Sequence, residues 1–196
     1  MMRLRLLSIF FLAALAACGG ERVAQAAPAG PVDSIKPPTE ALAEFRRGLP
    51  PVDSLSGGAA SRDELVARFA AAVQGSDTAA IAGLVLDRAE YAYLYFPSLQ
   101  RMNPGLNMQP EVMWMLHGQE SLKGVTRVLR RLGGGQARFG AYACEDAPRV
   151  EGENRYWHRC AIEVIAPDAD TATLQLFGSL LERGGRFKIV SYANDF

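Results

Sequence analysis

The sequence has no excess of charge of either sign. Its 21 Lys and Arg side chains balance 21 Asp and Glu side chains, so the formal net charge at pH 7 is +0. A protein that binds nucleic acid needs a basic face that neutralises phosphates. The one basic cluster, Arg127, Arg130 and Arg131, has the spacing of the solvated side of a helix. We therefore expect no nucleic-acid partner.

Motifs that carry chemistry are scarce as well. The chain has only two histidines and three cysteines, and it contains no glycine-rich phosphate loop, no serine nucleophile elbow and no HExxH sequence. These absences exclude whole reaction classes. The two cysteines of the domain lack the paired spacing of a zinc ligand set. We expect neither a metal nor a cofactor.

Long apolar runs are missing except at the start of the chain. Leu6–Ala17 has one polar residue, Ser8, and follows Arg3 and Arg5. A membrane-spanning helix needs about 20 apolar residues, so this run is too short for a comfortable permanent anchor. A basic stretch followed by a short apolar run is typical of an export signal. We interpret residues 1–17 as a signal peptide.

The signal ends in Leu15-Ala16-Ala17-Cys18, which resembles the lipobox of bacterial lipoproteins. In that family the cysteine thiol receives a diacylglycerol, and cleavage leaves the lipidated cysteine as the first residue. Two or three acyl chains hold a protein stably at a membrane. The resemblance therefore implies an anchored protein of the cell envelope that faces the periplasm. Gly19 after the cysteine resembles proteins sent to the outer membrane, if the host is Gram-negative. An ordinary secretory signal is the alternative.

The segment 18–60 has the composition of a tether. Six of the eleven prolines lie between Gly19 and Ala60, together with many Ala, Gly and Ser residues. Such a composition buries too little apolar surface to offset the entropy of the chain, so we interpret most of it as a flexible spacer. Thr39–Arg47 fits either a short helix or a transient turn. Residues 61–196 are long enough for one domain with its own core.

Two helices are predicted at the start of this domain. Ser61–Glu64 fits a capping box, apolar residues follow at helical spacing, and Gly75 ends the run. Ser76 or Asp77 caps a second helix, which ends near Asp87. The very short turn between the two helices favours an antiparallel pair.

The middle of the domain has a mixed pattern. Tyrosines alternate with apolar residues in Glu90–Phe96, which favours a strand, although a continuing helix stays open. Pro97–Pro110 is rich in turn-forming residues and predicts a loop. Glu111–Leu116 predicts a helical turn that carries Trp114. A third main helix is predicted from Ser121 to the three glycines that follow Leu132.

After these glycines the periodicity changes to that of strands. Strands are predicted at Ala137–Glu145, Tyr156–Ile165, Thr171–Leu181 and Phe187–Tyr192. Turn-forming residues lie at Gly152 to Asn154, at Pro167-Asp168 and at Gly184-Gly185. Short connections make neighbouring strands antiparallel. Helices followed by a strand meander predict an α+β fold, with the N-terminal helices packed on a curved antiparallel sheet.

This layout, with the phrases ARFAAAVQGSDTAAIAGLV and GRFKIVSYANDF, resembles the NTF2-like superfamily. The resemblance covers most of residues 61–196. It implies an NTF2-like cone, in which a bent sheet wraps around helices and leaves a pocket at the open end. The superfamily includes isomerases, dehydratases, ligand carriers and interaction modules, so the fold leaves the function open.

Cys144 and Cys160 are expected to form a disulfide. An export signal leads to an oxidising compartment, where paired cysteines are bridged. If the strands on either side of Gly152 form a hairpin, residues whose numbers sum to 304 face each other. Cys144 then lies opposite Cys160, and Tyr142 lies opposite Ile162. Two buried free thiols are the alternative.

Few side chains are candidates for catalysis. In the same register His158 lies opposite Asp146, and an imidazole oriented by a carboxylate is a common general base. Asp195 is a further candidate. The alternative for His158 is a partly exposed strand histidine near a surface acid. We interpret His117 as a helix-end residue, which is favourable there when it is protonated.

Four aromatic residues, Tyr91, Tyr93, Tyr95 and Trp114, are the candidates for ligand binding. Their rings offer apolar area and their polar tips suit the mouth of a pocket, although sheet packing explains them equally. We expect a lipoprotein that binds a small apolar ligand or an envelope protein without catalysis. An NTF2-like acid–base enzyme, of isomerase or dehydratase type, and a structural or assembly accessory are the alternatives.

Overall fold

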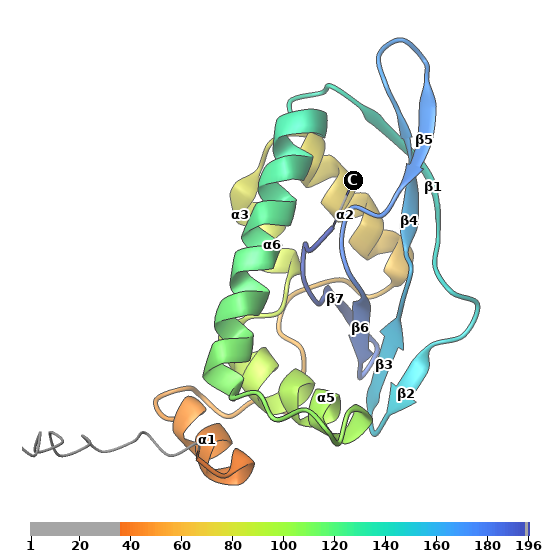
Figure 1. Cartoon of the computed structure of the whole chain (residues 1–196). Coiled ribbons are helices and arrows are strands. Elements are labelled where there is room, and N and C mark those ends of the chain that lie inside the picture. Colours follow the sequence, from red (N-terminus) through yellow and green to blue (C-terminus); the bar gives the residue numbers. More distant parts are fainter. Residues whose placement is uncertain (1–35, 195) are drawn as a thin grey trace, which may run out of the picture. The chain divides into compact units, whose positions relative to one another are not determined.

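The computed structural model describes residues 36–194 and 196, of which Lys36–Phe196 form one compact unit (Figure 1). The predicted signal peptide, Cys18 and Asp195 lie outside the described residues. Helices come first along the chain and antiparallel strands follow. The predicted α+β class is therefore confirmed.

The helices and strands are numbered along the chain. The helices are α1 (Pro38–Phe45), α2 (Arg62–Gln74), α3 (Thr78–Leu84), α4 (Arg88–Glu90), the π-helix η1 (Tyr91–Tyr95), α5 (Phe96–Met102) and α6 (Pro110–Leu132). The strands are β1 (Arg138–Ala143), β2 (Arg149–Glu151), β3 (Asn154–Trp157), β4 (Ala161–Ile165), β5 (Thr171–Leu174), β6 (Leu180–Arg183) and β7 (Arg186–Ile189).

Helices α2 and α3 begin at side-chain caps, as predicted. The Ser61 hydroxyl accepts a hydrogen bond from the Glu64 backbone N–H at 3.0 Å. The Glu64 carboxylate accepts one from the Ala60 N–H, one residue before the position that the capping box predicts. Asp77 caps α3 through the Ala80 N–H at 2.9 Å. Each cap satisfies backbone groups that the first helical turn leaves unpaired, and is worth about 1 kcal/mol.

Residues 90–96 are helical, and the strand that their alternation favoured is not formed. A capping box between Asp87 and Glu90 starts the helix, because each side chain accepts a hydrogen bond from the other's backbone N–H. Pro97, in the first turn of α5, has no N–H to donate to the preceding turn. The residues just before α5 form the wider π-helical turn η1. The predicted loop 97–110 is therefore helical as far as Met102.

Helix α6 is continuous where two separate elements were predicted. The expected interruption between Leu116 and Ser121 does not occur, and Ser121 lies inside the helix rather than at its cap. A glycine inside a helix costs about 1 kcal/mol, which packing along 23 residues offsets. Consequently His117 lies in the middle of α6, and its interpretation as a helix-end residue is wrong.

The strands form two antiparallel sheets, in the orders β1-β4-β5 and β2-β3-β6-β7. The predicted strand 156–165 divides into β3 and β4, since Arg159 has a φ of 49° and turns the backbone between them. The predicted strand 171–181 divides in the same way into β5 and β6. The prediction missed β2, which forms a hairpin with β3 through the turn at Gly152.

The disulfide between Cys144 and Cys160 is present. Next to it the register is the predicted one, since Tyr142 faces Ile162 and Ala143 faces Ala161. The bridge joins the end of β1 to the residue just before β4.

The main core lies where the helices meet both sheets. Figure 1 shows α2, α3 and α6 on one side and the strands on the other. Phe69 of α2 contacts Phe177 edge-on at 5.2 Å between ring centroids and stacks on Tyr192 at 5.7 Å. Val128 of α6 and Ile162 of β4 are fully buried in the same cluster. The C-terminal segment, which carries Tyr192, is therefore part of the core.

Residues 36–60 were predicted to belong to the tether, but they pack against the rest of the compact unit. Helix α1 is present, and Phe45 and Leu55 are buried. The Arg46 guanidinium donates to the carbonyl oxygen of Ala92 in η1 at 2.9 Å and 3.1 Å. The compact unit therefore begins at Lys36, ahead of the expected boundary at residue 61.

Candidate functional site

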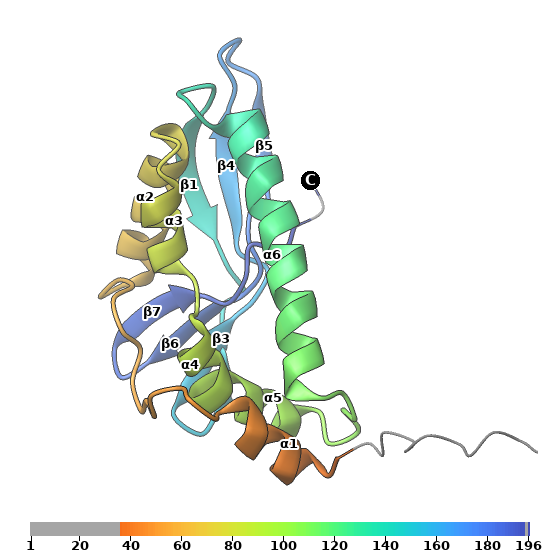
Figure 2. The ribbon, with the colours of Figure 1, turned by 90° about the vertical axis from the view of Figure 1, so that its left-hand side faces the viewer.

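A groove of about 420 Å³ lies between α3 and α6. Figure 2 shows α3 to the left of α6, with strands visible between them. The α3 side of the groove is formed by Thr78, Ile81, Ala82, Val85 and Leu86. The apolar side chains of α6 that line it are Trp114, Leu122, Val125 and Leu129. The walls are thus mostly apolar, which is the character of a site for an apolar ligand.

Tyr192 lines the groove and is tied to both helices. Its hydroxyl donates to the Ile81 carbonyl of α3 at 2.6 Å, and its backbone N–H donates to the Ser121 hydroxyl of α6 at 3.0 Å. Burial raises the pKa of this phenol, so it stays neutral and donates. These bonds and the stacking on Phe69 fix this part of the groove before any ligand arrives.

His117 is the polar side chain of the groove that can titrate near neutral pH. Its Nε2 lies 2.8 Å from the Val190 carbonyl oxygen. A carbonyl only accepts, so Nε2 carries the proton. Burial lowers the pKa of His117, which favours the neutral imidazole. Nδ1 is then an acceptor, and it has no hydrogen-bond partner among the described residues.

The groove holds too few convergent polar groups for acid–base chemistry. Ser121 already accepts from the chain, and His117 already donates to it. No carboxylate lines the groove. A general acid–base mechanism uses positioned groups that donate and accept protons, and His117 is the one side chain of the groove lining that titrates near neutral pH.

Of the four aromatic residues predicted to line a pocket, Trp114 lines this groove and the three tyrosines do not. Tyr91 is fully buried, with its ring centroid 4.9 Å from that of Trp114 and 5.3 Å from that of His117. Its hydroxyl is the buried side-chain polar atom without a hydrogen-bond partner in the described part of the chain. Tyr91 therefore supports the groove from behind.

Tyr93 and Tyr95 pack against neighbouring elements. The Arg46 guanidinium lies 4.5 Å from the ring centroid of Tyr93, a cation–π contact. Tyr95 packs edge-on against Tyr156 at 5.9 Å, and burial raises its pKa to about 12. Tyr91 and Tyr95, four residues apart, lie on one face with ring centroids 5.5 Å apart, whereas Tyr93 between them lies on another face.

The predicted catalytic candidates form no pair. His158 Nδ1 lies 2.6 Å from the Ser179 hydroxyl, and the His158 ring stacks on Tyr156. Between residues 36 and 194, Asp146 makes neither a hydrogen bond nor an ion pair with His158. Neither His158 nor Ser179 lines the α3–α6 groove. The His158–Ser179 contact therefore joins β3 to the segment before β6.

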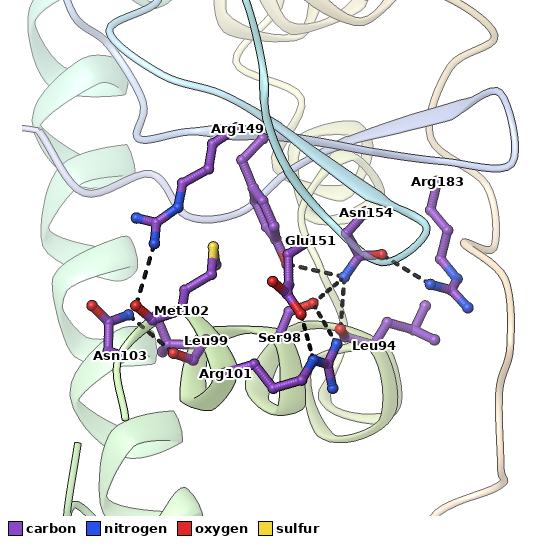
Figure 3. A network of polar contacts seen from close by, with 11 residues as sticks. Leu94, Ser98, Leu99, Arg101, Met102, Asn103, Arg149, Glu151, Asn154 and Arg183 are labelled. Carbon is purple, nitrogen blue, oxygen red and sulfur yellow. Dashed lines mark hydrogen bonds and ion pairs between the residues drawn. The ribbon is translucent and has the colours of Figure 1, made fainter. Parts of the chain in front are cut away.

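A polar network lies where the β2–β3 hairpin meets α5 (Figure 3). The buried amide of Asn154 donates to the Leu94 carbonyl at 2.8 Å and to the Ser98 hydroxyl at 2.9 Å, and its oxygen accepts from Arg183 at 3.0 Å. Arg101 pairs with Glu151 at 2.5 Å. The polar groups of Asn154 are satisfied within the chain, so this network holds elements together and is not a ligand site.

A buried ion pair joins the end of α4 to β7. Lys188 of β7 donates to the Glu90 carboxylate at 2.7 Å, with side chains 4% and 1% exposed. Glu90 also accepts from the Ser56 N–H and hydroxyl and from the Asp87 N–H. The role of Glu90 in a buried ion pair was not predictable from local sequence, because its partner Lys188 is 98 residues away.

In the range 36–194, no helix is both long enough and apolar enough to cross a bilayer. Those residues also hold no cluster of three or more His, Cys, Asp or Glu side chains with metal-binding geometry.

The chain was compared with protein-family models, with curated proteins and with solved structures. No protein-family model, no curated protein and no solved structure matches it.

Proposed function

We propose that this protein is a lipid-anchored protein of the cell envelope whose domain binds a small apolar ligand without turnover. The lipobox-like sequence ending at Cys18 supports the anchor. The α3–α6 groove supports the binding, and outer-membrane placement follows from Gly19 if the host is Gram-negative. Catalysis is no part of the proposal, since the groove holds no pair of acid–base groups.

The observation that carries the binding proposal is an apolar groove that is already formed. A groove of about 420 Å³ is within the range of small-molecule sites, which are mostly apolar with a few fixed polar groups. Here those groups are His117 Nδ1 and the Ser121 hydroxyl. Packing of Tyr192 and Val128 against the core keeps α3 and α6 apart without a ligand.

The NTF2-like cone is part of the same proposal. Its support is the order of helices and strands, and the way in which α2, α3 and α6 cover one side of two short sheets (Figure 1). Such a cone leaves a pocket at its open end. Here the groove opens between helices.

A protein partner is the second candidate. Met115 and Leu116 of α6 are 52% and 42% exposed, and Val112 beside them is 41% exposed. Exposed apolar side chains that lie together on a helix are typical of a contact surface. This surface lies on the solvent side of α6, next to the groove.

A filling variant tests the binding proposal. Ala82 is exposed and lines the groove, whereas Ala79 is exposed on the same helix and does not. With a neutral naphthylamine dye as probe, Ala82→Phe should weaken binding by about tenfold or more, because the ring occupies the groove. Ala79→Phe should bind like the wild type. Equal binding by both variants, or no binding by the wild type, refutes the proposal.

The anchor has its own test. Cys18→Ala removes the thiol that would be lipidated, so the variant should leave the detergent phase for the aqueous phase in a partitioning experiment. Unchanged partitioning contradicts lipidation at Cys18.

A further inference from the structure

A second hollow adjoins the groove on α6. It encloses about 330 Å³ and is lined by Lys123, Arg127 and Arg130 together with Leu122 and Thr126. Leu122 and Thr126 line the apolar groove as well. An apolar channel and a cationic surface are therefore continuous over one turn of the helix.

The charge of this hollow is unbalanced within the described residues. Arg127 donates to the backbone and side-chain oxygens of Asn194, both of them neutral. Arg130 forms no ion pair with any described side chain, and Lys123 pairs with Glu120 at the surface. Interaction with the helix dipole explains basic residues in the last turn. It does not explain Arg127, because the effect fades beyond that turn, and the one described acidic partner in this cluster is Glu120, which pairs with Lys123.

The shape of the groove favours one kind of apolar body. Its lining extends along α6 from Trp114 to Leu129, which is about 22 Å at 1.5 Å per residue. A lining that extends this far along one helix is elongated, and it suits a linear chain. The acyl chains of one bilayer leaflet extend over about 15 Å, so a chain of that length fits within the groove.

We propose that the groove binds an anionic amphiphile with one linear chain, of the fatty-acid class. The chain lies between α3 and α6 with its end near Trp114, and the carboxylate lies over Thr126 beside Lys123 and Arg130. This inference rests on the proposed function, which requires only an apolar ligand. Burial of each methylene contributes about 0.8 kcal/mol to affinity, and the cationic side chains select the charged head.

Two probes with the same chain test the inference. Dodecanoate and dodecanol, below their aggregation limits, compete with the neutral dye for the full-length protein. Dodecanoate should displace the dye at about tenfold lower concentration, and added salt should reduce this preference because the charges are exposed.

Charge removal then locates the head group. Arg130→Gln should weaken dodecanoate by about fivefold, the effect of one unit charge near 4 Å in water, and leave dodecanol unchanged. The double variant Lys123→Gln/Arg130→Gln should remove the preference. Arg138→Gln, an exposed charge on β1 outside the groove, is the matched control. All three positions are exposed, and thermal melting verifies that each variant is folded.

The outcomes separate this inference from the function on which it rests. If dodecanol and dodecanoate displace the dye equally in every variant, the anionic head is wrong and apolar binding stands. If a rigid fused-ring compound displaces the dye better than either chain, the linear class is wrong. If the dye itself does not bind, the proposed function fails first.

Discussion

Glu90 and Lys188 carry the chain's most deeply buried ion pair within the range that the structure describes. The carboxylate joins three segments, because it also accepts hydrogen bonds from Ser56 and Asp87. Burying two charges costs desolvation energy, which close geometry and the extra hydrogen bonds offset. The pair and its hydrogen bonds therefore hold the segment around Ser56 and strand β7 against Glu90, which directly precedes η1.

Glu90→Gln should lower the free energy of unfolding by about 3 to 5 kcal/mol, because it leaves the Lys188 ammonium buried without a counter-charge. Chemical denaturation measures the change. The double variant Glu90→Gln/Lys188→Met removes both charges and should recover part of the loss. If the double variant is as unstable as the sum of the two single variants, the two groups act independently and this account of the pair is wrong.

His117 makes stability depend on pH. Burial lowers its pKa below the unfolded value near 6.5, so below that pH the unfolded chain binds more protons than the folded one. The stabilising contribution is present above about pH 6.5 and is lost as the pH falls toward the folded pKa. The melting temperature of the wild type should therefore fall more steeply between pH 7 and pH 5 than that of His117→Gln. Parallel curves contradict a buried neutral imidazole.

At the scale of elements, α6 carries the site, and its two interior glycines have opposite roles. A Cβ at Gly118 would meet nothing within 4 Å, whereas a Cβ at Gly124 would lie 1.7 Å from the Tyr192 carbonyl oxygen. Gly124 therefore permits the C-terminal segment to cross the helix closely, and Gly118 only weakens the helix.

The two glycines give a matched pair of variants. Gly118→Ala should raise the free energy of unfolding by about 0.5 to 1 kcal/mol, as for an exposed interior helix position. Gly124→Ala should lower it by about 1 to 3 kcal/mol, because the backbone of Tyr192 must move. Urea denaturation distinguishes them. A loss at Gly118 as large as that at Gly124 contradicts a straight, continuous α6.

Elements with strong local signals were predictable. Ser61 and Asp77 cap helices where the sequence indicates, since a cap involves residues only three positions apart. Glu90–Phe96 was not predictable as a helix, because its aromatic residues favour strands and a capping box from Asp87 overrides them. The break between β3 and β4 at Arg159 has no local signal, because a positive φ outside glycine is imposed by the fold.

At the scale of the whole molecule, the groove arises from tertiary packing. Ile81 and Val125 were each predictable as inward-facing helix residues, yet only the fold brings them to opposite walls. Trp114 lines the groove, whereas Tyr93, which was placed beside it on the assumption of a strand, does not. The Cys144–Cys160 pair was predicted by counting in one register across Gly152. Next to the bridge β1 and β4 have that register, although β2 and β3 beside the turn pair one residue out of it.

The disulfide joins the end of β1 to the start of β4, two neighbouring strands of the same sheet. Replacing both Cys144 and Cys160 with Ser should lower the free energy of unfolding by about 3 kcal/mol, the value for a loop of this length in the chain-entropy model. Denaturation of the variant beside the oxidised wild type measures the loss. A variant as stable as the wild type contradicts a structural role for the bridge.

The central claim is that an apolar ligand binds between α3 and α6, and methyl NMR tests it most directly. The protein is labelled at Ile, Leu and Val methyl groups and titrated with dodecanoate. Ile81, Val85, Val125 and Leu129 should shift together and saturate at one ligand equivalent, while Leu181, buried in a different cluster, should not move. Unchanged groove methyls at saturating dodecanoate, or shifts centred on Leu181, contradict the account.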